Sequence, residues 1–346
     1  MFQPAVRAFA SLKLTLLGMA ALAVGALVSY NSADAHLAWL LVPLGLLSGN
    51  LLAALLFNPR FRRQGGLMVF HLGLLLVLVF AAWGRLTHLD ARLEITEGQQ
   101  FDATQVMVDS RGPTHPWALD RVVFEQAEVE VDYAPGLRRG HTRSWVRVPA
   151  ADGGAERVSV GDDSPLTANS YRFYTTSNKG FAVVLTWLGD GGEAVAGAIH
   201  LPSYPLLDWK QVNSWLSPAG QEIEVELLLP GAREEARAWT LNGSVLDGAV
   251  LRVRPEAAAK VLAAGEAVGA RGGRLRFEGV RMWMGYKITY DPILPWLFAA
   301  ALVAVLGLAW HFWGKLWSRP LVEGVRGNFV REQGGDGLGG TSVVRG

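Results

Sequence analysis

Four long stretches of the sequence are almost entirely apolar and contain no Asp, Glu, Lys or Arg. A helix needs about 20 residues to cross a bilayer core of ~30 Å, and each stretch approaches or reaches that length. A soluble fold would leave much of this apolar surface exposed to water. The sequence therefore predicts four membrane-spanning helices, at Leu14–Tyr30, Leu37–Phe57, Leu67–Gly84 and Ile293–Trp313.

The composition favours a membrane protein and excludes several kinds of chemistry. Half of the 346 residues are hydrophobic and only 18% are charged, whereas an average soluble domain has about 25% charged residues. The 32 Lys and Arg nearly balance the 31 Asp and Glu, so nucleic acid is not an expected partner. The chain has no cysteine, which excludes disulfides, Cys-ligated metals and a Cys nucleophile of its own.

The Lys and Arg residues beside the spans predict the orientation of the chain. They precede the first span, separate the second from the third and follow the fourth, whereas the loop 31–36 has none. Both termini are therefore expected in the cytoplasm and the segment 85–291 outside it. Alternatively, the first span is a secretory signal cleaved at Ala33-Asp34-Ala35, which would leave three spans and His36 at the new N-terminus.

The long segment between the third and fourth spans is expected to be rich in β-strands. Apolar and charged residues alternate in several places, and Gly, Pro and Asp separate these places, as in an antiparallel sandwich or open barrel. Clear examples of the alternation are Ala127–Tyr133, Glu222–Leu227 and Arg274–Phe277, and one helix is expected at Glu256–Ala264.

The predicted fold class is thus an α+β membrane protein, with four transmembrane helices and a large extracytoplasmic β-rich domain between helices 3 and 4. Its expected parts are an N-terminal membrane part at 1–84, the β-rich domain at 85–291, the last helix at 292–317 and a tail at 318–346. The tail is rich in Gly and has no periodicity, so it is expected to be disordered in the cytoplasm.

His71 is the most informative candidate for a functional residue. It lies in the predicted third span within Phe70-His71-Leu72-Gly73, about 6 Å from the cytoplasmic end at 1.5 Å per residue. Ionisable residues inside membrane helices are costly and tend to mark functional sites. A neutral imidazole among apolar side chains suits haem iron, although a hydrogen bond between helices without a cofactor is the competing interpretation.

Three other histidines are weaker candidates for haem binding. His311 lies near the cytoplasmic end of the fourth span, where interfacial anchoring competes with a ligand role. His36 and His88 flank the outer ends of the first and third spans and could form a second site, or could be solvated. Hydrolase and nucleotide-binding motifs are absent from the sequence, so no catalytic residue is predicted.

Two polar features of the β-rich segment remain open to more than one interpretation. A basic cluster could meet haem propionates or an acidic partner, or could be a solvated edge strand; it comprises Arg138, Arg139, His141, Arg143 and Arg147. The sequence Asp162-Asp163-Ser164 offers paired acids, but it follows a predicted strand and is typical of a turn.

Several motifs together resemble one known family. Ser11-Leu12-Lys13-Leu14-Thr15 opens the first span, and Phe70-His71-Leu72-Gly73 lies in the third. Three more follow in the β-rich segment, at Val160–Leu166, Ser170–Tyr174 and Gly285–Pro292. Their order, combined with the arrangement of spans, resembles the ResB family (also called CcsB) of system II cytochrome c maturation. The resemblance extends from about Ser11 to Trp317.

The resemblance implies a function. Such proteins work with a CcsA-type membrane partner, carry haem b outward as cargo and deliver it to the C-x-x-C-H motif of an apocytochrome c. It implies that His71 is an axial haem ligand near the cytoplasmic side. On this interpretation we expect spans 3 and 4 and the partner to form an apolar channel. The resemblance also implies the bacterial inner membrane as the location. The tryptophan-rich haem-handling loop belongs to the partner, so this chain alone is not expected to be a complete holocytochrome c synthase.

Two other functions remain compatible with the residues. In one, the chain is a membrane-anchored scaffold whose β-rich domain recruits a partner without haem, and His71 is a packing residue. In the other, it is a transport or sensor subunit whose outer domain binds a small ligand. Haem content that depends on His71 would separate the first interpretation from the scaffold.

Overall fold

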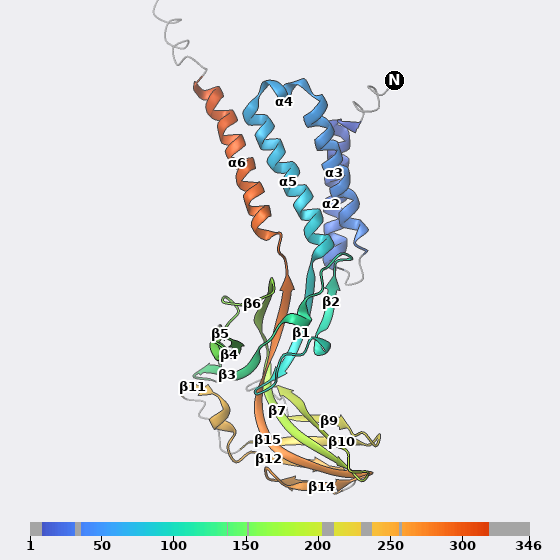
Figure 1. The fold of residues 1–346 in the computed structure, drawn as a ribbon, viewed down its shortest axis with the longest axis vertical. Coiled ribbons are helices and arrows are strands. Elements are labelled where there is room, and N and C mark those ends of the chain that lie inside the picture. The colour runs from blue at the N-terminus through green and yellow to red at the C-terminus, as the bar shows by residue number, and fades with distance from the viewer. Residues whose placement is uncertain are drawn as a thin grey trace, which may run out of the picture. The chain divides into compact units, whose positions relative to one another are not determined.

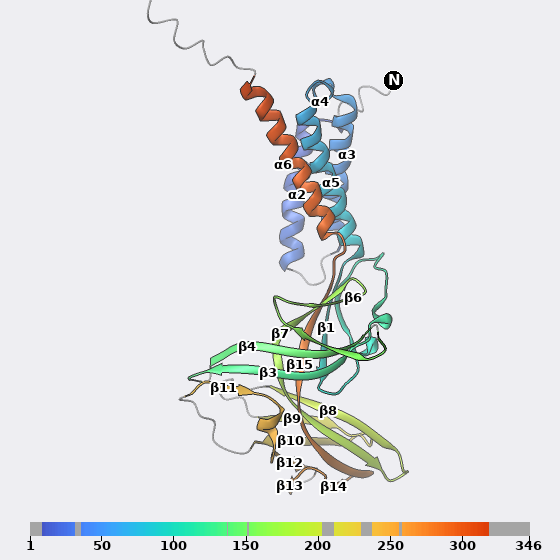
Figure 2. The same ribbon diagram turned by 60° about the vertical axis from the view of Figure 1, so that its left-hand side comes forward.

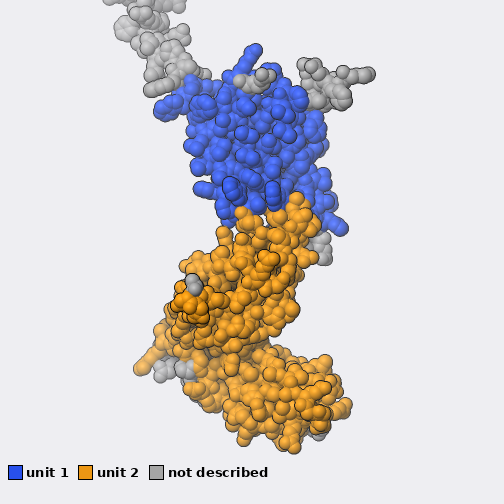
Figure 3. All heavy atoms as spheres, in the orientation of Figure 1, with its two compact units in different colours: residues 1–83, 293–346 blue, residues 84–292 orange. Residues whose placement is uncertain are grey.

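The computed structural model describes residues 9–31, 36–136, 138–150, 152–202, 211–229, 237–255 and 258–317. The chain divides into two compact units, which we describe separately (Figure 3). The first unit takes its residues from 1–83 and 293–346, and the second consists of 84–292. We call the second unit the β domain. The predicted disordered tail at 318–346 lies outside the described residues.

Among the described residues, four helices are long and apolar enough to cross a membrane, which indicates a multi-pass membrane protein. They are α2 (Leu12–Asn31), α3 (Ala38–Phe57), α5 (Gly65–Thr87) and α6 (Leu294–Trp317), labelled in Figure 1. The prediction of four membrane-spanning helices, with an antiparallel β-rich domain between the third and the fourth, is confirmed. The short helix α4 (Pro59–Arg63) begins at Asn58, whose Oδ1 accepts the N–H of Arg60 at 3.1 Å, as N-cap residues do.

Helices α2 and α3 pack through small residues and one buried amide. A Cβ atom on Gly18 would lie 2.8 Å from Cδ2 of Leu47, so the Leu47 side chain would have to shift to accept any larger residue there. Asn50 on α3 is 4% exposed. Its Oδ1 accepts the Thr15 hydroxyl at 2.7 Å, and its Nδ2 donates to the carbonyl oxygens of Phe9 and Ser11. The amide therefore ties the start of the first span to α3.

Helices α5 and α6 approach each other backbone to backbone. A Cβ atom on Gly73 would lie 2.5 Å from the backbone N of Ala304, and one on Gly66 would lie 2.6 Å from that of His311. A Cβ atom on Gly307 would in turn collide with the backbone N of Phe70. Small residues allow membrane helices to approach this closely, and here they leave no room between the two helices.

The described residues of the β domain form three antiparallel sheets (Figure 2). The largest has the path β2-β1-β15-β7-β6, with β14 paired to β15 and β8 paired to β7. Its strands are β1 (Leu89–Thr96), β2 (Met107–Arg111), β6 (Leu166–Ala168), β7 (Tyr171–Gly189), β8 (Ala194–Pro202), β14 (Ala267–Ala270) and β15 (Gly273–Tyr290).

The two smaller sheets have four strands each. One has the order β11-β3-β4-β5, formed by β11 (Trp239–Leu241), β3 (Glu125–Ala134), β4 (Arg138–Pro149) and β5 (Ala155–Val160). The other has the order β13-β12-β10-β9, formed by β13 (Lys260–Leu262), β12 (Val250–Arg254), β10 (Glu222–Leu228) and β9 (Val212–Leu216). Short 3₁₀ turns connect some of the strands, namely η1 (Ala103–Gln105), η2 (Leu119–Arg121) and η3 (Gly243–Leu246).

The predicted alternation is visible in the strands. On β10, Ile223 and Val225 are fully buried, whereas the intervening Glu224 lies on the opposite face and pairs with Arg254 of β12 at 2.6 Å. Residues two apart share one face of a strand. The period-two pattern therefore located the core-facing side chains correctly.

The helix predicted at Glu256–Ala264 is wrong. Residues 256 and 257 lie outside the described residues, and Lys260–Leu262 forms strand β13 instead. Leu262 pairs with Leu251 of β12 and is 4% exposed. The gain from burying Leu262 in the sheet outweighs the helix propensity of the Ala-rich sequence, because tertiary packing routinely overrides a weak local preference.

Candidate functional site

His71 is held on α5 by a hydrogen bond within its own helix. Its Nδ1 lies 2.8 Å from the carbonyl oxygen of Leu67. A carbonyl oxygen can only accept, so Nδ1 carries the proton and Nε2 of the neutral imidazole carries a free lone pair. Within the described part of the chain, no hydrogen bond engages Nε2. Metal-binding histidines commonly show this arrangement, with one nitrogen fixed and the other available.

Two aromatic rings flank the imidazole. The ring centroid of Phe61, on α4, lies 4.6 Å from that of His71, and the centroid of Phe70 lies 4.9 Å away. Both contacts are edge to face, and the His71 side chain is half-buried. The sequence placed Phe70 beside His71, but the contribution of Phe61 depends on the turn that α4 makes before α5. The site therefore combines one basic nitrogen with apolar walls.

His71 does not face α6. Successive residues of a helix are about 100° apart, so His71 is rotated by roughly 160° from Gly73, which touches α6. The expected channel between spans 3 and 4 is wrong at this level, because the close contacts at Gly73 and Gly307 leave no space for a porphyrin. A ligand of His71 would lie on the other side of α5.

The weaker histidine candidates are not brought to His71. His311 on α6 is half-buried, its backbone lies against Gly66, and its ring is 5.6 Å from that of Phe312. His36 belongs to the first unit and is exposed. His88 belongs to the β domain, where both ring nitrogens are engaged, Nδ1 at 2.9 Å from the Arg85 carbonyl oxygen and Nε2 at 3.1 Å from Ser110 Oγ. Among the described residues, no group of three or more His, Asp or Glu side chains could hold a metal ion.

A histidine without any sequence signal forms a network in the β domain. Nε2 of His200 on β8 lies 2.9 Å from Thr96 Oγ1, and Nδ1 lies 3.0 Å from a carboxylate oxygen of Glu94. The ring stacks on Trp283 with centroids 4.6 Å apart. The hydrogen bond from His200 is the main reason why the pKa of Glu94 is lowered. Glu94, Thr96 and His200 line a cavity of about 500 Å³.

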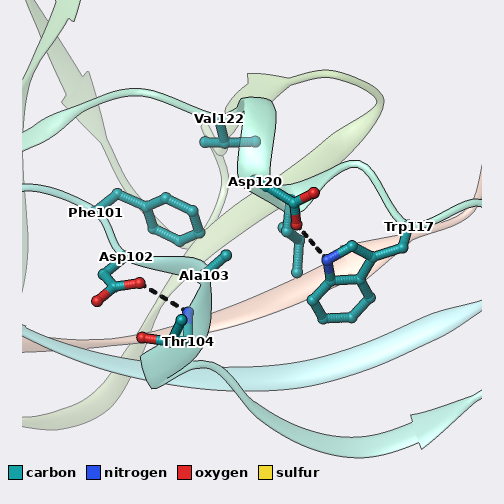
Figure 4. Close-up of a pocket in the computed structure, with 8 residues that line it drawn as sticks. Phe101, Asp102, Ala103, Thr104, Trp117, Asp120 and Val122 are labelled. Atoms are coloured by element: carbon teal, nitrogen blue, oxygen red, sulfur yellow. Dashed lines mark hydrogen bonds between the residues drawn. The ribbon is translucent and has the colours of Figure 1, made fainter.

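A second cavity of the β domain, of about 470 Å³, lies beside η1 and η2 (Figure 4). Phe101 and Val122 line it, and Asp102 and Asp120 add carboxylates. Asp120 accepts a hydrogen bond from the indole of Trp117. The acidic side chains make this cavity unsuitable for an anionic ligand such as a haem propionate.

The fold and the membrane helices define a class: a multi-pass membrane protein that carries a β domain between its last two spans. The model of the ResB-like family matches residues 60–227, which contain the motifs Phe70–Gly73, Val160–Leu166 and Ser170–Tyr174, so the resemblance is confirmed over this part of the chain. The matched part includes His71 and the strands from β1 to β9. It supports a role in cytochrome c biogenesis, the process in which this family acts.

The solved structure "Cytochrome c Heme Lyase CcmF" is also similar to the chain. The sequence identity is 13% and the TM-score is 0.28, over 88% of this chain and 35% of that chain. The chain thus spans about a third of that protein's length. A similarity this weak carries no argument about the function of this chain. No curated protein matches the sequence significantly.

Proposed function

We propose that the chain is the haem-handling membrane subunit of a system II cytochrome c maturation complex. In this function His71 ligates the iron of haem b, which is cargo, and a CcsA-type partner completes the path outward to an apocytochrome c with a C-x-x-C-H motif. The complex resides in the bacterial inner membrane, with both termini in the cytoplasm and the β domain outside. The ResB-like match and the geometry of His71 support this proposal.

The observation that carries the proposal is the state of the two ring nitrogens of His71. The carbonyl oxygen of Leu67 orients the ring through Nδ1 and leaves Nε2 free to bind iron. Phe61 and Phe70 supply apolar contacts beside the ring. Because α6 closes the opposite face of α5, haem and the partner occupy the face on which His71 lies.

The chain itself supplies binding and orientation rather than covalent chemistry. Bound haem offers vinyl groups that form thioethers with the thiols of the apocytochrome. This chain contributes no thiol, since it has no cysteine. The resemblance places the tryptophan-rich haem-handling loop in the partner, so the chain acts as one component of a holocytochrome c synthase complex and not alone.

The test is the haem content of the protein purified together with its CcsA-type partner. We expect a b-type absorption band that is strongly reduced in His71→Ala. Two variants serve as controls: His311→Ala changes a histidine in the same unit, and His115→Ala changes a histidine of the β domain. Both should retain the band. Added imidazole should restore the band in His71→Ala, because it replaces the missing nitrogen without repairing any packing defect.

The scaffold function is the alternative outcome of the same experiment. Unchanged haem content in His71→Ala, together with normal assembly with the partner, would leave His71 as a packing residue and the β domain as a recruiting module. Loss of the band in all three variants would indicate a general failure of assembly. The addition of imidazole to His71→Ala then decides between the two functions, because imidazole restores the band only where an iron ligand is missing.

A further inference from the structure

A cavity of about 300 Å³ in the β domain is lined by charged residues that have no role in the proposed binding of haem iron by His71. Arg139 and His141 of the basic cluster reach it from β4, and Asp162 reaches it from the turn after β5. Its remaining wall is formed by β7, from Thr175 to Lys179. Residues far apart in the sequence thus meet at one place.

An irregularity in β7 forms this wall. Thr175 pairs with Tyr286 and Lys179 pairs with Met284, so residues 176–178 lie opposite Gly285 alone. A Cβ atom on Gly285 would lie 2.8 Å from the carbonyl oxygen of Asn178. Glycine is therefore needed at position 285 for the chain to bulge, and bulges commonly redirect a side chain towards a site.

Lys179 lines the cavity as a buried ammonium group without a counter-ion. The residue is only 8% exposed, and its Nζ donates to Oγ1 of Thr142. No carboxylate of the described residues forms an ion pair with it. Burial and the charge of Arg139 lower the pKa of Lys179 to about 8, against the opposing effect of Asp162. Buried charges are ordinarily paired, so Lys179 favours the binding of an anionic group in this cavity.

We infer that this cavity binds a carboxylate group. Lys179 and Arg139 supply two positive charges and Asp162 one negative charge, so the site has a net formal charge of +1 and matches a monoanion. A phosphate group carries about −1.5 to −2 at neutral pH and is matched less well. The Thr142 hydroxyl accepts from Lys179, so its own hydrogen is free to donate to the ligand.

The size of the cavity restricts the ligand further. Its volume of about 300 Å³ lies at the lower end for small-molecule sites, so a carboxylate on a short stem enters while a larger body stays outside. Two sources have this chemistry: a propionate of haem and an acidic side chain of a partner protein. The carboxylate site does not depend on His71. A negative result for the carboxylate site would therefore leave the proposed role of His71 in haem binding untouched, and the reverse also holds.

The test uses the full-length protein in detergent and measures thermal unfolding of the β domain. Sodium propionate is compared with sodium chloride at equal ionic strength. In the wild-type protein we expect the unfolding temperature to rise by about 3–6 °C when propionate is at ten times its dissociation constant. The rise should be absent in Lys179→Met and in Arg139→Gln. It should persist in the matched control Arg138→Gln, because Arg138 is exposed and does not line the cavity.

An equal rise in all four proteins would be a bulk salt effect and would overturn the inference, as would no rise in the wild-type protein. If Lys179→Met does not fold, the comparison of Arg139→Gln with Arg138→Gln decides. A second measurement is the pH dependence of acylation at Lys179. A bound carboxylate should move the pKa of Lys179 upward from about 8. If the pKa of Lys179 stays the same when propionate is added, the inference is also contradicted.

The source of the carboxylate is distinguished in the His71→Ala protein, which removes the transmembrane ligand. Haem has free carboxylates, whereas its dimethyl ester has none and is otherwise identical. If haem stabilises the β domain and the ester does not, the site binds a haem propionate. Stabilisation by a Glu-containing peptide, but not by its Gln counterpart or by haem, would assign it to a protein partner. Either result supports a carboxylate site, whether or not His71 binds iron.

Discussion

The hydroxyl oxygen of Tyr286 on β15 lies 2.6 Å from the hydroxyl oxygen of Ser144 on β4, in the core of the β domain. Gln126 on β3 closes a ring of three hydrogen bonds: its Nε2 donates to Ser144 Oγ at 2.8 Å, and its Oε1 accepts from Tyr286 at 2.8 Å. All three side chains are at most 1% exposed. The ring joins the largest sheet to the sheet that carries the basic cluster.

Replacing Tyr286 by Phe should destabilise the β domain by about 1–3 kcal/mol, because Gln126 and Ser144 each lose a buried partner. The measurement is urea-induced unfolding followed by tryptophan fluorescence. Tyr174→Phe is the matched control, since Tyr174 on β7 is partly exposed and its hydroxyl makes no hydrogen bond among the described residues. That variant should remain within about 0.5 kcal/mol of the wild type. Equal destabilisation by Tyr286→Phe and Tyr174→Phe would contradict a stabilising role for the three hydrogen bonds among Tyr286, Ser144 and Gln126.

The spans and the alternating strands could be predicted because each depends on local periodicity and composition. Helix α5 extends from Gly65 to Thr87, a few residues beyond the predicted Leu67–Gly84. The prediction ended where apolar residues end, whereas the backbone hydrogen bonds of the helix continue past Arg85. The Ala-rich segment around Lys260 was misassigned because the burial of Leu262 against β12 is a long-range effect.

The candidate sites were predictable only in part. The depth of His71 in an apolar span identified it without coordinates, but the contact with Phe61 and the closed interface with α6 follow from packing. Lys179 carried no sequence signal at all. Its burial results from two extra residues in β7 opposite Gly285, a register shift that periodicity cannot reveal.

Substituting Gly73 by Leu should separate α5 from α6, because even a Cβ atom at this position would lie 2.5 Å from the Ala304 backbone. Since the native chain has no cysteine, the pair Val77→Cys and Ala300→Cys can report on the interface by disulfide formation. The antiparallel register places these positions opposite each other, one turn beyond the contact of Gly73 with Ala304. Crosslinking should be efficient in the otherwise native sequence and severalfold lower with Gly73→Leu. Gly45→Leu should leave it unchanged, because nothing lies within 4 Å of a Cβ atom there.

Asn50→Leu should loosen the start of the first span. The carbonyl oxygen of Phe9 loses its donor, and the Thr15 hydroxyl loses Oδ1 as an acceptor. Interhelical polar contacts in membranes contribute about 0.6–2 kcal/mol. A cysteine introduced at Ala10 should therefore react faster with a maleimide in Asn50→Leu. Ser48→Ala is the control, since the Ser48 hydroxyl bonds only to the Leu44 carbonyl oxygen of its own helix, and an equal increase there would exclude the specific role of Asn50.

Glu97, just after β1, should make the stability of the β domain depend on pH. Burial raises the pKa of its carboxyl from 4.5 to about 7, although the N–H groups of Val129 and Met282 donate to it at 2.7 and 3.0 Å and oppose this shift. Between pH 4.5 and 7 the folded state therefore binds more protons than the unfolded state. Stability consequently falls as the pH rises through this window, by on the order of 2 kcal/mol because the side chain is partly exposed.

The contribution of Glu97 is isolated by comparing the wild type with Glu97→Gln in urea unfolding at several pH values. The variant should be less stable, since an amide offers only one oxygen to the two N–H groups of Val129 and Met282. Its deficit relative to the wild type should shrink steadily from pH 5 to pH 7. In the control Glu222→Gln, which changes an exposed residue of β10, the difference should stay constant. A deficit for Glu97→Gln that is independent of pH would show that Glu97 keeps an ordinary pKa and acts only through its hydrogen bonds.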